Sequence, residues 1–180
     1  MISLRKLKEE DALLMLEWMH DPDIQKGFKK NMLAASLDDT TNFCRKAIIP
    51  EKLTDGASIH YAIVDENDEY LGTVSLKDIS LDNKSAEYAI TLRKKAQGKG
   101  IAYKATGLVL KKAFEDYDLH RVYLSVIADN DAAIRLYERS GFTFEGEFRD
   151  HLFLNGRYKN WKWYSILRDE YNAELFEVKK

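Results

Sequence analysis

The chain has 180 residues, 45% hydrophobic and 32% charged, which suits one folded domain over residues 1–180 with a hydrophobic core. A formal net charge of −2 argues against binding nucleic acid by bulk positive charge, so we expect no such partner. No apolar run approaches the roughly 18 residues of a membrane span, and the N-terminus lacks an apolar core of signal-peptide length. The single cysteine, Cys44, excludes an internal disulfide and suggests a reducing compartment. We therefore predict a cytoplasmic protein that does not bind membranes.

Apolar periodicity and turn residues predict strands and helices in alternation along the chain. Strands are expected at residues 2–7, 59–64, 70–76, 86–94, 121–127, 142–148 and 158–167. Helices are expected at residues 9–19, 24–30 and 36–50, from the glycine stretch to residue 117, and at residues 130–140. In the long central helix, Tyr103, Gly107, Leu110, Phe114 and Tyr117 form the expected buried face. This order predicts a mixed α/β (α+β) domain.

The stretch Gln97-Gly98-Lys99-Gly100-Ile101-Ala102 lies between a predicted strand and a predicted helix. A glycine-rich turn that enters a helix leaves backbone N–H groups unpaired at the positive end of the helix dipole, which favours an anion. Gly98 and Gly100 lack a Cβ, so a phosphate can approach the backbone, and Lys99 adds positive charge. The stretch predicts a pyrophosphate site; the structural alternative is a helix cap that contains glycines by chance.

Three phosphate-binding motifs compete for this stretch. A Walker P-loop requires lysine after its second glycine, but Ile101 follows Gly100, and a Rossmann fingerprint requires a third glycine where the chain has Tyr103. The pattern [QR]-x-x-G-x-[GA] is satisfied by Gln97, Gly100 and Ala102. It resembles the acyl-CoA pyrophosphate loop of the GNAT superfamily of N-acetyltransferases.

A second motif strengthens this resemblance. The stretch Asn130-Asp131-Ala132-Ala133-Ile134-Arg135-Leu136-Tyr137-Glu138-Arg139-Ser140-Gly141-Phe142 is similar to N-x-x-A-I-x-L-Y-E-[KR]-x-G-F, the second GNAT signature. It follows the first motif with one predicted helix and one predicted strand between them, as the family requires. The resemblance covers about residues 2–171. It implies a single GNAT-like domain with a central, mostly antiparallel sheet, splayed at the acyl-CoA site and flanked by helices.

The last two strands look like the branch that contains ribosomal-protein, spermidine and nucleotide-aminosugar acetyltransferases. Trp18 followed by Asp21-Pro22 also fits that branch, whereas Asn160 stands where many members carry Asp. The resemblance implies an enzyme that transfers acetyl from acetyl-CoA to a primary amine by direct attack in a ternary complex. The acceptor is a polyamine, an aminosugar or a protein N-terminus. It implies no metal, and it allows a homodimer.

The resemblance also assigns residues to the cosubstrate. It places the pantetheine arm along the strand before the glycine turn, with a backbone N–H near Leu92 as oxyanion donor; the alternative is a strand with every group paired. It places the pyrophosphate on the turn, and Asn130 at the pantetheine arm, although Asn130 could serve only as a helix cap. The expected cofactor-binding residues are Ile90, Thr91, Leu92, Arg93, Lys94, Gln97, Gly98, Lys99, Gly100, Ile101, Ala102, Asn130, Ala133 and Tyr137.

Tyr137 and Glu87 are the expected catalytic residues. A phenol of ordinary pKa about 10 can protonate the departing thiolate of a thiol of pKa about 8.5, so Tyr137 is the candidate general acid. Glu87 is the candidate general base, which takes the ammonium proton through water. The structural alternatives are that Tyr137 only packs in the core and that Glu87 points to solvent. The weaker candidates for the base are His151, Asp150 and His20.

Other reactive or aromatic residues are expected to play structural parts. Cys44 lies in a predicted helix, and direct transfer needs no acyl-enzyme. His120, just before a strand, is expected to be structural. The aromatic residues Tyr158, Trp161, Trp163 and Tyr164 suggest base stacking, but the net charge favours a core or dimer-interface strand. The competing function is a non-catalytic acyl-CoA sensor or interaction module, which the presence of Tyr137 disfavours.

Overall fold

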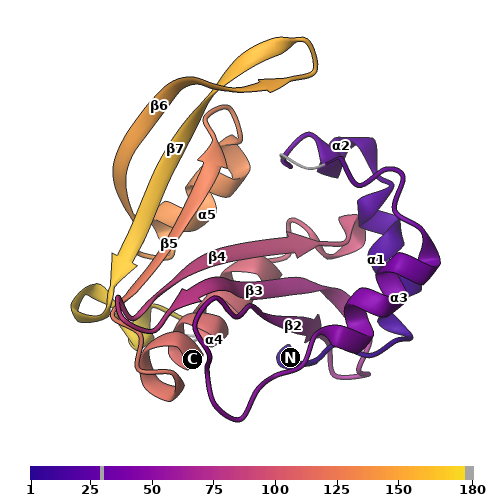
Figure 1. The fold of residues 1–180 in the computed structure, drawn as a ribbon, viewed down its shortest axis with the longest axis horizontal. Helices are drawn as coiled ribbons and strands as arrows, with labels where there is room; N and C mark the ends of the chain where they lie inside the picture. Colours follow the sequence, from indigo (N-terminus) through magenta and orange to yellow (C-terminus); the bar gives the residue numbers. More distant parts are fainter. Residues whose placement is uncertain (29–30, 177–180) are drawn as a thin grey trace.

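The computed structural model describes residues 1–28 and 31–176, and within them one open sheet has the strand order β1-β2-β3-β4-β5-β7-β6 (Figure 1). Neighbouring strands are antiparallel except for β4 and β5. The predicted mixed and mostly antiparallel sheet is therefore confirmed. The strands are β1 (Ser3–Lys6), β2 (Ile59–Val64), β3 (Tyr70–Ser80), β4 (Ser85–Leu92), β5 (Arg121–Ile127), β6 (Thr143–Leu154) and β7 (Arg157–Leu167).

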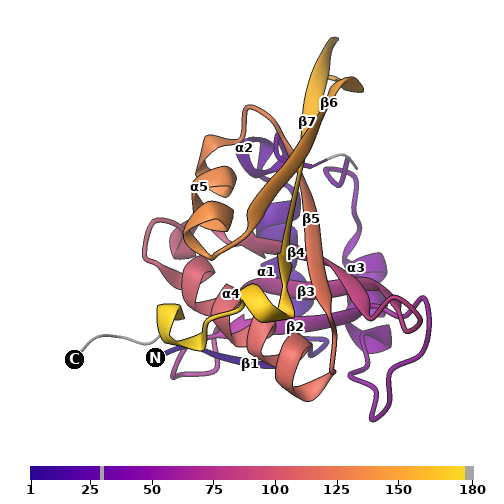
Figure 2. The same cartoon turned by 90° about the vertical axis from the view of Figure 1, so that its left-hand side faces the viewer.

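Helices cover both faces of this sheet. Figure 2 shows α4 and α5 on one side of it and α3 on the other. A π-helical turn, η2 (Lys112–Asp116), continues α4. The α-helices are α1 (Asp11–Met19), α2 (Pro22–Gln25), α3 (Leu37–Lys46), α4 (Ile101–Lys111) and α5 (Asp131–Arg139). The 3₁₀ turns are η1 (Lys94–Ala96), η3 (Arg168–Glu170) and η4 (Ala173–Phe176).

Two hydrophobic clusters lie on opposite faces because side chains alternate along each strand. The larger cluster packs α4 onto the sheet and includes Val109 and Leu110 of α4 and Val74 and Leu76 of β3. The smaller cluster lies under α1 and α3 and includes Met15, Trp18 and Cys44. Both clusters anchor β3 firmly, and β3 in turn pairs with β4, the strand that leads to the glycine turn.

Several predicted boundaries are wrong for identifiable reasons. The expected helix 24–30 begins at Pro22, where the fixed φ of proline suits a first helical position and Asp21 caps it; it ends at Gln25, and residues 29–30 lie outside the described residues. The expected helix 36–50 starts correctly after Ser36 but ends at Lys46. Ala47 leaves the helix with φ −73° and ψ 74°, ahead of Pro50, which disfavours helical backbone before it.

The predicted buried face of the central helix is confirmed at Gly107, Leu110 and Phe114, but the helix buries further residues. Ala105, Val109 and Ala113 are fully buried against the sheet, whereas Tyr103 is only partly buried. Gly107 lies under Phe176 of η4, where an added Cβ would meet the ring at 2.4 Å. Helical periodicity alone did not anticipate that the chain end covers this side of α4.

The β6–β7 hairpin stands out from the body of the molecule (Figure 1). Asn155 and Gly156 have φ angles of 51° and 78°, as a tight two-residue hairpin turn requires. A bulge between Phe148 and Leu152 interrupts the register, which is why β6 runs on to Leu154 instead of ending at residue 148. The side-chain oxygen of Asn160 accepts from the Asp150 N–H at 2.9 Å within this bulge.

The sheet opens between its two parallel strands. β4 and β5 pair only at their first three positions, the last of which joins Glu87 to Tyr123. Beyond that point β4 stays with β3 to Leu92, while β5 leaves with β7, and Figure 1 shows the two strands diverging. The backbone of residues 88–92 is thus left without a strand partner on its β5 side. This opening is the splay that the resemblance predicted.

Candidate functional site

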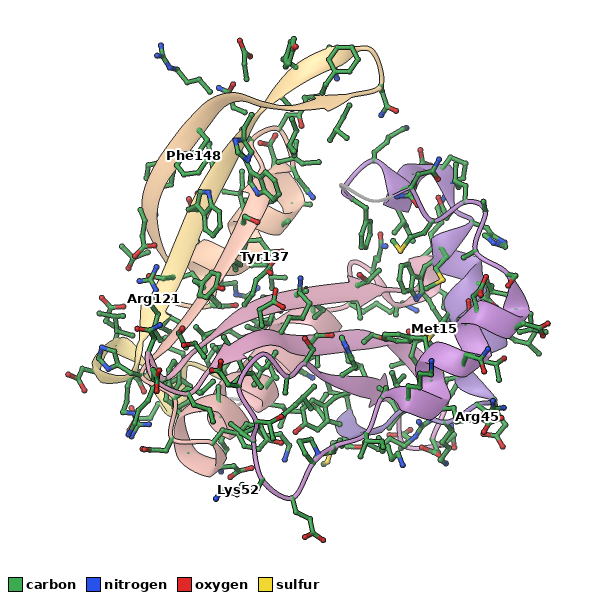
Figure 3. The ribbon with its side chains drawn as sticks, in the orientation of Figure 1. Met15, Arg45, Lys52, Arg121, Tyr137 and Phe148 are labelled. Atoms are coloured by element: carbon green, nitrogen blue, oxygen red, sulfur yellow. The ribbon has the colours of Figure 1, made fainter. Side chains whose placement is uncertain are left out.

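A cleft of about 1540 Å³ runs through the opening between β4 and β5. One end is lined by the glycine turn and the N-terminus of α4, and the other by β5, β7 and the bulge of β6. Tyr137 of α5 lies at the opening between the two diverging strands (Figure 3). The cleft therefore connects the predicted anion site to the predicted catalytic residues in one continuous space.

The glycine turn, which is the predicted anion site, lies at one end of the cleft. Gly98 and Gly100 have φ angles of 70° and 71°, which residues with a Cβ adopt at a cost, and open space lies where their Cβ atoms would stand. No side chain caps the N-terminus of α4, so its first backbone N–H groups are available to an anion. The Nε2 atom of Gln97 donates to the Leu92 carbonyl at 3.1 Å and ties the turn to the end of β4.

Most of the expected cofactor-binding residues line this cleft. Arg93 and Lys99 do not. The Arg93 guanidinium points away from the cleft and donates hydrogen bonds of 2.8 Å to Glu17 and to Glu69. Its backbone N–H donates to the Leu71 carbonyl. The expected residues that do line the cleft are Ile90, Thr91, Leu92, Lys94, Gln97, Gly98, Gly100, Ile101, Ala102, Asn130, Ala133 and Tyr137.

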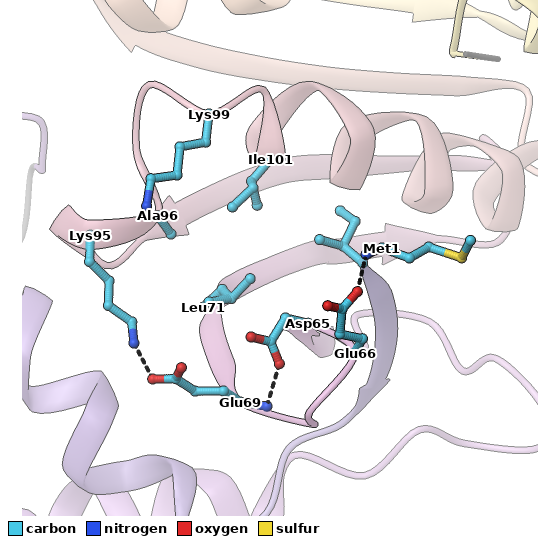
Figure 4. Close-up of a pocket in the computed structure, with 10 residues that line it drawn as sticks. Met1, Asp65, Glu66, Glu69, Leu71, Lys95, Ala96, Lys99 and Ile101 are labelled. Carbon is cyan, nitrogen blue, oxygen red and sulfur yellow. Dashed lines mark hydrogen bonds and ion pairs between the residues drawn. The ribbon is translucent and has the colours of Figure 1, made fainter. Parts of the chain in front are cut away.

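Lys99 faces a smaller pocket of about 370 Å³ behind the turn (Figure 4). That pocket lies between the turn and the loop before β3, and Lys95 pairs there with Glu69. The N-terminal amine of Met1 pairs with Glu66 at 2.8 Å. Since charges of both signs already pair across it and the catalytic residues lie elsewhere, we do not assign the reaction to this pocket.

Asn130 and Ala133 bring the start of α5 to the cleft. The Asn130 side chain accepts from the Ala133 N–H at 3.2 Å and so caps the helix. Asn130 also lies close to Gly27, where an added Cβ would be 3.3 Å from its Nδ2 atom. The segment after α2 thus approaches α5 across the cleft. The capping role of Asn130 is visible directly, and its role at the pantetheine arm stays a prediction.

Tyr137 is buried at 8% exposure, yet it lines the cleft. Its ring packs edge-on against Tyr88 and against Phe142, with centroids 6.0 Å apart in both pairs. Among the described residues, no group forms a hydrogen bond with its hydroxyl. Burial raises the pKa of Tyr137 to about 12, because the apolar surroundings disfavour tyrosinate. The side chain is therefore a protonated donor, held rigidly at the opening of the sheet.

Glu87 lines the same cleft at the point where β4 and β5 part. Its carboxylate forms an ion pair of 3.1 Å with Lys77 on β3, and its side chain is 25% exposed. The alternative that Glu87 points only to solvent is therefore not what the structure shows. The carboxylate and the Tyr137 hydroxyl border one space, as a base and an acid that act on one reaction need to do.

The other candidate bases and the cysteine are placed differently. His20 lies beside the Ala35 carbonyl, with its Nε2 at 2.9 Å, and it does not line the cleft. The His151 ring does line it. The Cys44 thiol is buried at 3.3 Å from the Met15 sulfur, and burial raises the pKa of Cys44 to about 11. A buried thiol away from the cleft is not a nucleophile for this site.

Several cleft residues were not predicted from the sequence. Trp161 and Trp163 are half-buried and line the cleft, so they lie outside the core where they were expected, while their place in a dimer interface stays a prediction. Of their neighbours, Tyr164 is buried in the core and Tyr158 is exposed. The spacing of Trp161 and Trp163 two positions apart on β7 indicates a shared face of the strand, but the sequence does not say whether that face borders the core or a cleft. Polar and charged residues that were also missed include Lys77, Tyr123, Arg135 and Arg139.

Comparisons with known proteins decide the family. Residues 2–143 match the family model described as an acetyltransferase (GNAT) domain. This chain belongs to the GNAT acetyltransferase family. A spermidine N(1)-acetyltransferase of Vibrio cholerae is 35% identical over 117 residues, 65% of this chain and 68% of that protein. A putative ribosomal N-acetyltransferase of Bacillus subtilis is 28% identical over 176 residues, 96% of this chain and 94% of that protein.

The solved structures agree with this assignment. The crystal structure of spermidine N-acetyltransferase from Vibrio cholerae in complex with CoA and spermine superposes with a TM-score of 0.84. It is 29% identical and covers 94% of this chain and 97% of that one. The prediction of an acetyl-CoA-dependent N-acetyltransferase is confirmed. The opened strand edge and the uncapped helix N-terminus of this GNAT domain fit the pantetheine arm and pyrophosphate of its cosubstrate.

Two further findings concern what the described residues contain. No group of three or more potential ligands among them could hold a metal ion. None of their helices has both the length and the apolar character needed to cross a membrane.

Proposed function

We propose that this GNAT enzyme acetylates a primary amine of a polyamine by direct attack in a ternary complex, within a single domain of residues 1–180. The observation that carries the direct route is the continuous cleft, which Tyr137, Glu87 and the glycine turn all line. The amine can enter from the β7 side and meet a thioester that lies along β4. In direct attack the amine itself is the nucleophile, so the reaction needs no covalent intermediate on the protein. Cys44 is buried away from this cleft and is not placed to form one.

In this proposal the chain grips the cosubstrate with backbone groups. The N–H groups at the start of α4 and in the glycine turn bind the pyrophosphate, and the free edge of β4 binds the pantetheine arm. A backbone N–H near Leu92 donates to the thioester carbonyl oxygen and stabilises the negative charge that develops there. One such donor typically contributes about 10²–10³ in rate.

Two side chains move protons. Glu87 accepts a proton from the ammonium group, directly or through water, so that the neutral nitrogen attacks the carbonyl carbon. As the carbon–sulfur bond breaks, Tyr137 donates its hydroxyl proton to the sulfur and is then reprotonated from solvent. Its raised pKa keeps the donor protonated across the working pH range. The products are an N-acetylated amine and CoA as a free thiol.

The relatives support the choice of a polyamine as acceptor. Spermidine acetyltransferases cover most of this chain at 29–35% identity, and one such structure holds CoA and spermine. One Bacillus subtilis relative is named a putative ribosomal N-acetyltransferase. A protein N-terminus is therefore the second candidate acceptor. An aminosugar is the third acceptor that the sequence predicted.

The test is CoA release from acetyl-CoA with spermidine, spermine, putrescine, glucosamine and an N-terminal peptide, beside a reaction without amine. We expect spermidine or spermine to give the highest kcat/KM, an acetylated product by mass spectrometry and intersecting initial-rate lines. Parallel lines or an acetylated Cys44 would contradict direct transfer. CoA binding without turnover of any amine would favour the non-catalytic acyl-CoA module.

A homodimer and a cytoplasmic location complete the proposal. β6 is an edge strand and carries three exposed phenylalanines, at 49%, 49% and 64% exposure: Phe144, Phe148 and Phe153. Exposed apolar edge strands are liable to pair with another chain. Sedimentation velocity is expected to show a dimer or larger assembly, and a monomer at all concentrations would reject this part. The buried free thiol of Cys44 is compatible with a reducing cytoplasm.

A further inference from the structure

A row of aromatic rings forms one wall of the cleft at its β7 end. We call Tyr123, Trp163, Trp161 and His151 the aromatic wall; all four line the cleft. The rings of Tyr123 and Trp163 are 6.1 Å apart at 28°, and those of Trp163 and Trp161 are 6.3 Å apart at 23°. The His151 ring lies across Trp161 at 5.2 Å and 60°.

The fold explains why these rings gather on one face. Trp161 and Trp163 are two positions apart on β7, so their side chains point to the same face of the sheet. Tyr123 comes from the neighbouring strand β5, and the bulge of β6 turns His151 toward Trp161. Phe148 supports the wall with its ring 5.9 Å from that of Trp163.

The carboxylates of the cleft are already neutralised by the protein itself. Among the described residues that line it, three are acidic, and each forms an ion pair with a lysine. The pairs are Asp23 with Lys26 at 2.7 Å, Glu87 with Lys77 at 3.1 Å, and Asp129 with Lys159. A polyamine carries at least one cationic nitrogen besides the amine that reacts. The described carboxylates of this cleft offer that second cation no unpaired partner.

Aromatic faces can bind such a cation instead. The negative face of a tryptophan ring attracts an ammonium group within about 6 Å, and tryptophan is the strongest of the aromatic side chains in this role. Arg121 already lies over the Tyr123 ring, with its guanidinium carbon 5.9 Å from the ring centroid. Among the described residues no cationic side chain lies over the ring of Trp163, the central member of the wall, so this ring is the one that we assign to a ligand.

We infer that the aromatic wall, with Trp163 at its centre, holds the non-reacting ammonium group of the acceptor by cation–π contact. This inference rests on the proposed acetylation of a polyamine. The wall starts at Tyr123, the register partner of Glu87, so an amine that reacts beside Glu87 has its remaining chain directed along Trp163 and Trp161. The 6.1–6.3 Å steps between rings are comparable to the spacing of successive nitrogens in an extended polyamine.

The experiment compares Trp163→Leu with the matched control Tyr158→Leu. Tyr158 lies on the same strand, is 63% exposed and does not line the cleft. Binding of spermidine and of n-butylamine, which has no second nitrogen, is measured by calorimetry with CoA present, and kcat and KM are measured for both amines. Thermal unfolding and CoA affinity verify that each variant is folded. Trp163→Phe serves as the conservative variant, and Trp161→Leu replaces Trp163→Leu if that variant does not fold.

We expect Trp163→Leu to weaken spermidine binding and raise its KM by about tenfold, with n-butylamine and CoA little affected. Trp163→Phe should restore part of the loss, and Tyr158→Leu should match the wild type. Equal losses for the two amines, or unchanged spermidine binding, would each overturn the inference. No spermidine binding by the wild type would overturn it as well. Spermidine binding through the wall without acetylation would uphold the inference and reject the proposed function.

Discussion

The side-chain amide of Gln97 donates a hydrogen bond of 3.1 Å to the backbone carbonyl of Leu92. This contact joins the first residue of the glycine turn to the last residue of β4. The two segments serve different parts of acetyl-CoA in the proposed mechanism, the pyrophosphate and the pantetheine arm. Gln97 therefore sets the distance between two binding segments, a positioning role that the motif pattern alone does not reveal.

Replacement of Gln97 by Ala should weaken CoA binding by about threefold to tenfold, the usual effect of one neutral hydrogen bond. Gln97→Glu keeps the size of the side chain but replaces the donor with a carboxylate that faces a carbonyl oxygen. It should weaken CoA binding more than Gln97→Ala. Calorimetry with CoA checks both variants, and equal affinity of all three proteins would contradict the positioning role.

The left-handed backbone of Gly100 gives a second prediction with a close control. Gly100→Ala forces a residue with a Cβ into φ 71°, at a cost of about 1–2 kcal/mol. Gly56 has φ 73° and equally open surroundings but lies outside the cleft, so Gly56→Ala should lower the free energy of unfolding by a similar amount. Urea unfolding measures this common loss.

Only the variant in the turn should affect the cosubstrate. A methyl group at residue 100 occupies the space where the phosphate approaches and disturbs the N–H groups around it. We expect CoA affinity to fall at least about tenfold in Gly100→Ala and to stay at the wild-type value in Gly56→Ala. Similar CoA affinities in the two variants would remove the turn from the binding site.

The sequence predicted those parts of the site that depend on local chemistry. The glycine turn and the cap of α5 are encoded within a few neighbouring residues, so Gly100 and Asn130 were recognised. Arg93 was misplaced because its partners, Glu17 and Glu69, are 76 and 24 residues away. Trp161 and Trp163 were missed as cleft residues because only the departure of β5 from β4 exposes their face. Tertiary pairing, which periodicity does not encode, decided these cases.

Asn160 stands where many members of the branch carry Asp, and two hydrogen bonds of its side-chain amide explain the difference. Its side-chain oxygen accepts from the Asp150 N–H, and its side-chain nitrogen donates to the Glu147 carboxylate at 2.5 Å. An aspartate at this position could make the first contact but not the second. The amide therefore satisfies both the bulge of β6 and the Glu147 side chain beside it.

We predict that Asn160→Asp destabilises the protein by about 1 kcal/mol near pH 8. Two facing carboxylates raise each other's pKa, so protonation of one of them restores a hydrogen bond. The loss of stability should therefore shrink as the pH falls toward 4. Among the described residues, the Asn172 side chain only accepts, from the Glu174 N–H, so Asn172→Asp is the control. Thermal unfolding across this pH range measures both variants, and identical profiles would refute the role of Asn160.

Tyr137 is the residue on which the proposed chemistry depends most. Its ring packs against Tyr88 and Phe142, while its hydroxyl faces the cleft without a described hydrogen-bond partner. Tyr137→Phe therefore removes the acid and keeps the packing. Because a raised pKa favours the protonated form, the hydroxyl remains a donor up to about pH 12. The rate of the wild type should rise with pH as the amine loses its proton, and Tyr137 should add no decline below pH 10.

General acid catalysis typically contributes about 10²–10⁴-fold, so kcat of Tyr137→Phe should fall by roughly that factor where proton donation limits the rate. CoA affinity and the unfolding temperature should change little, because the turn, the β4 edge and the ring contacts remain. The measurement uses the best acceptor from the amine comparison, since slow attack by a poor amine would hide the effect. A stable variant with nearly unchanged kcat would mean that water or another group protonates the thiolate. Lost stability with kcat intact would make Tyr137 a packing residue alone.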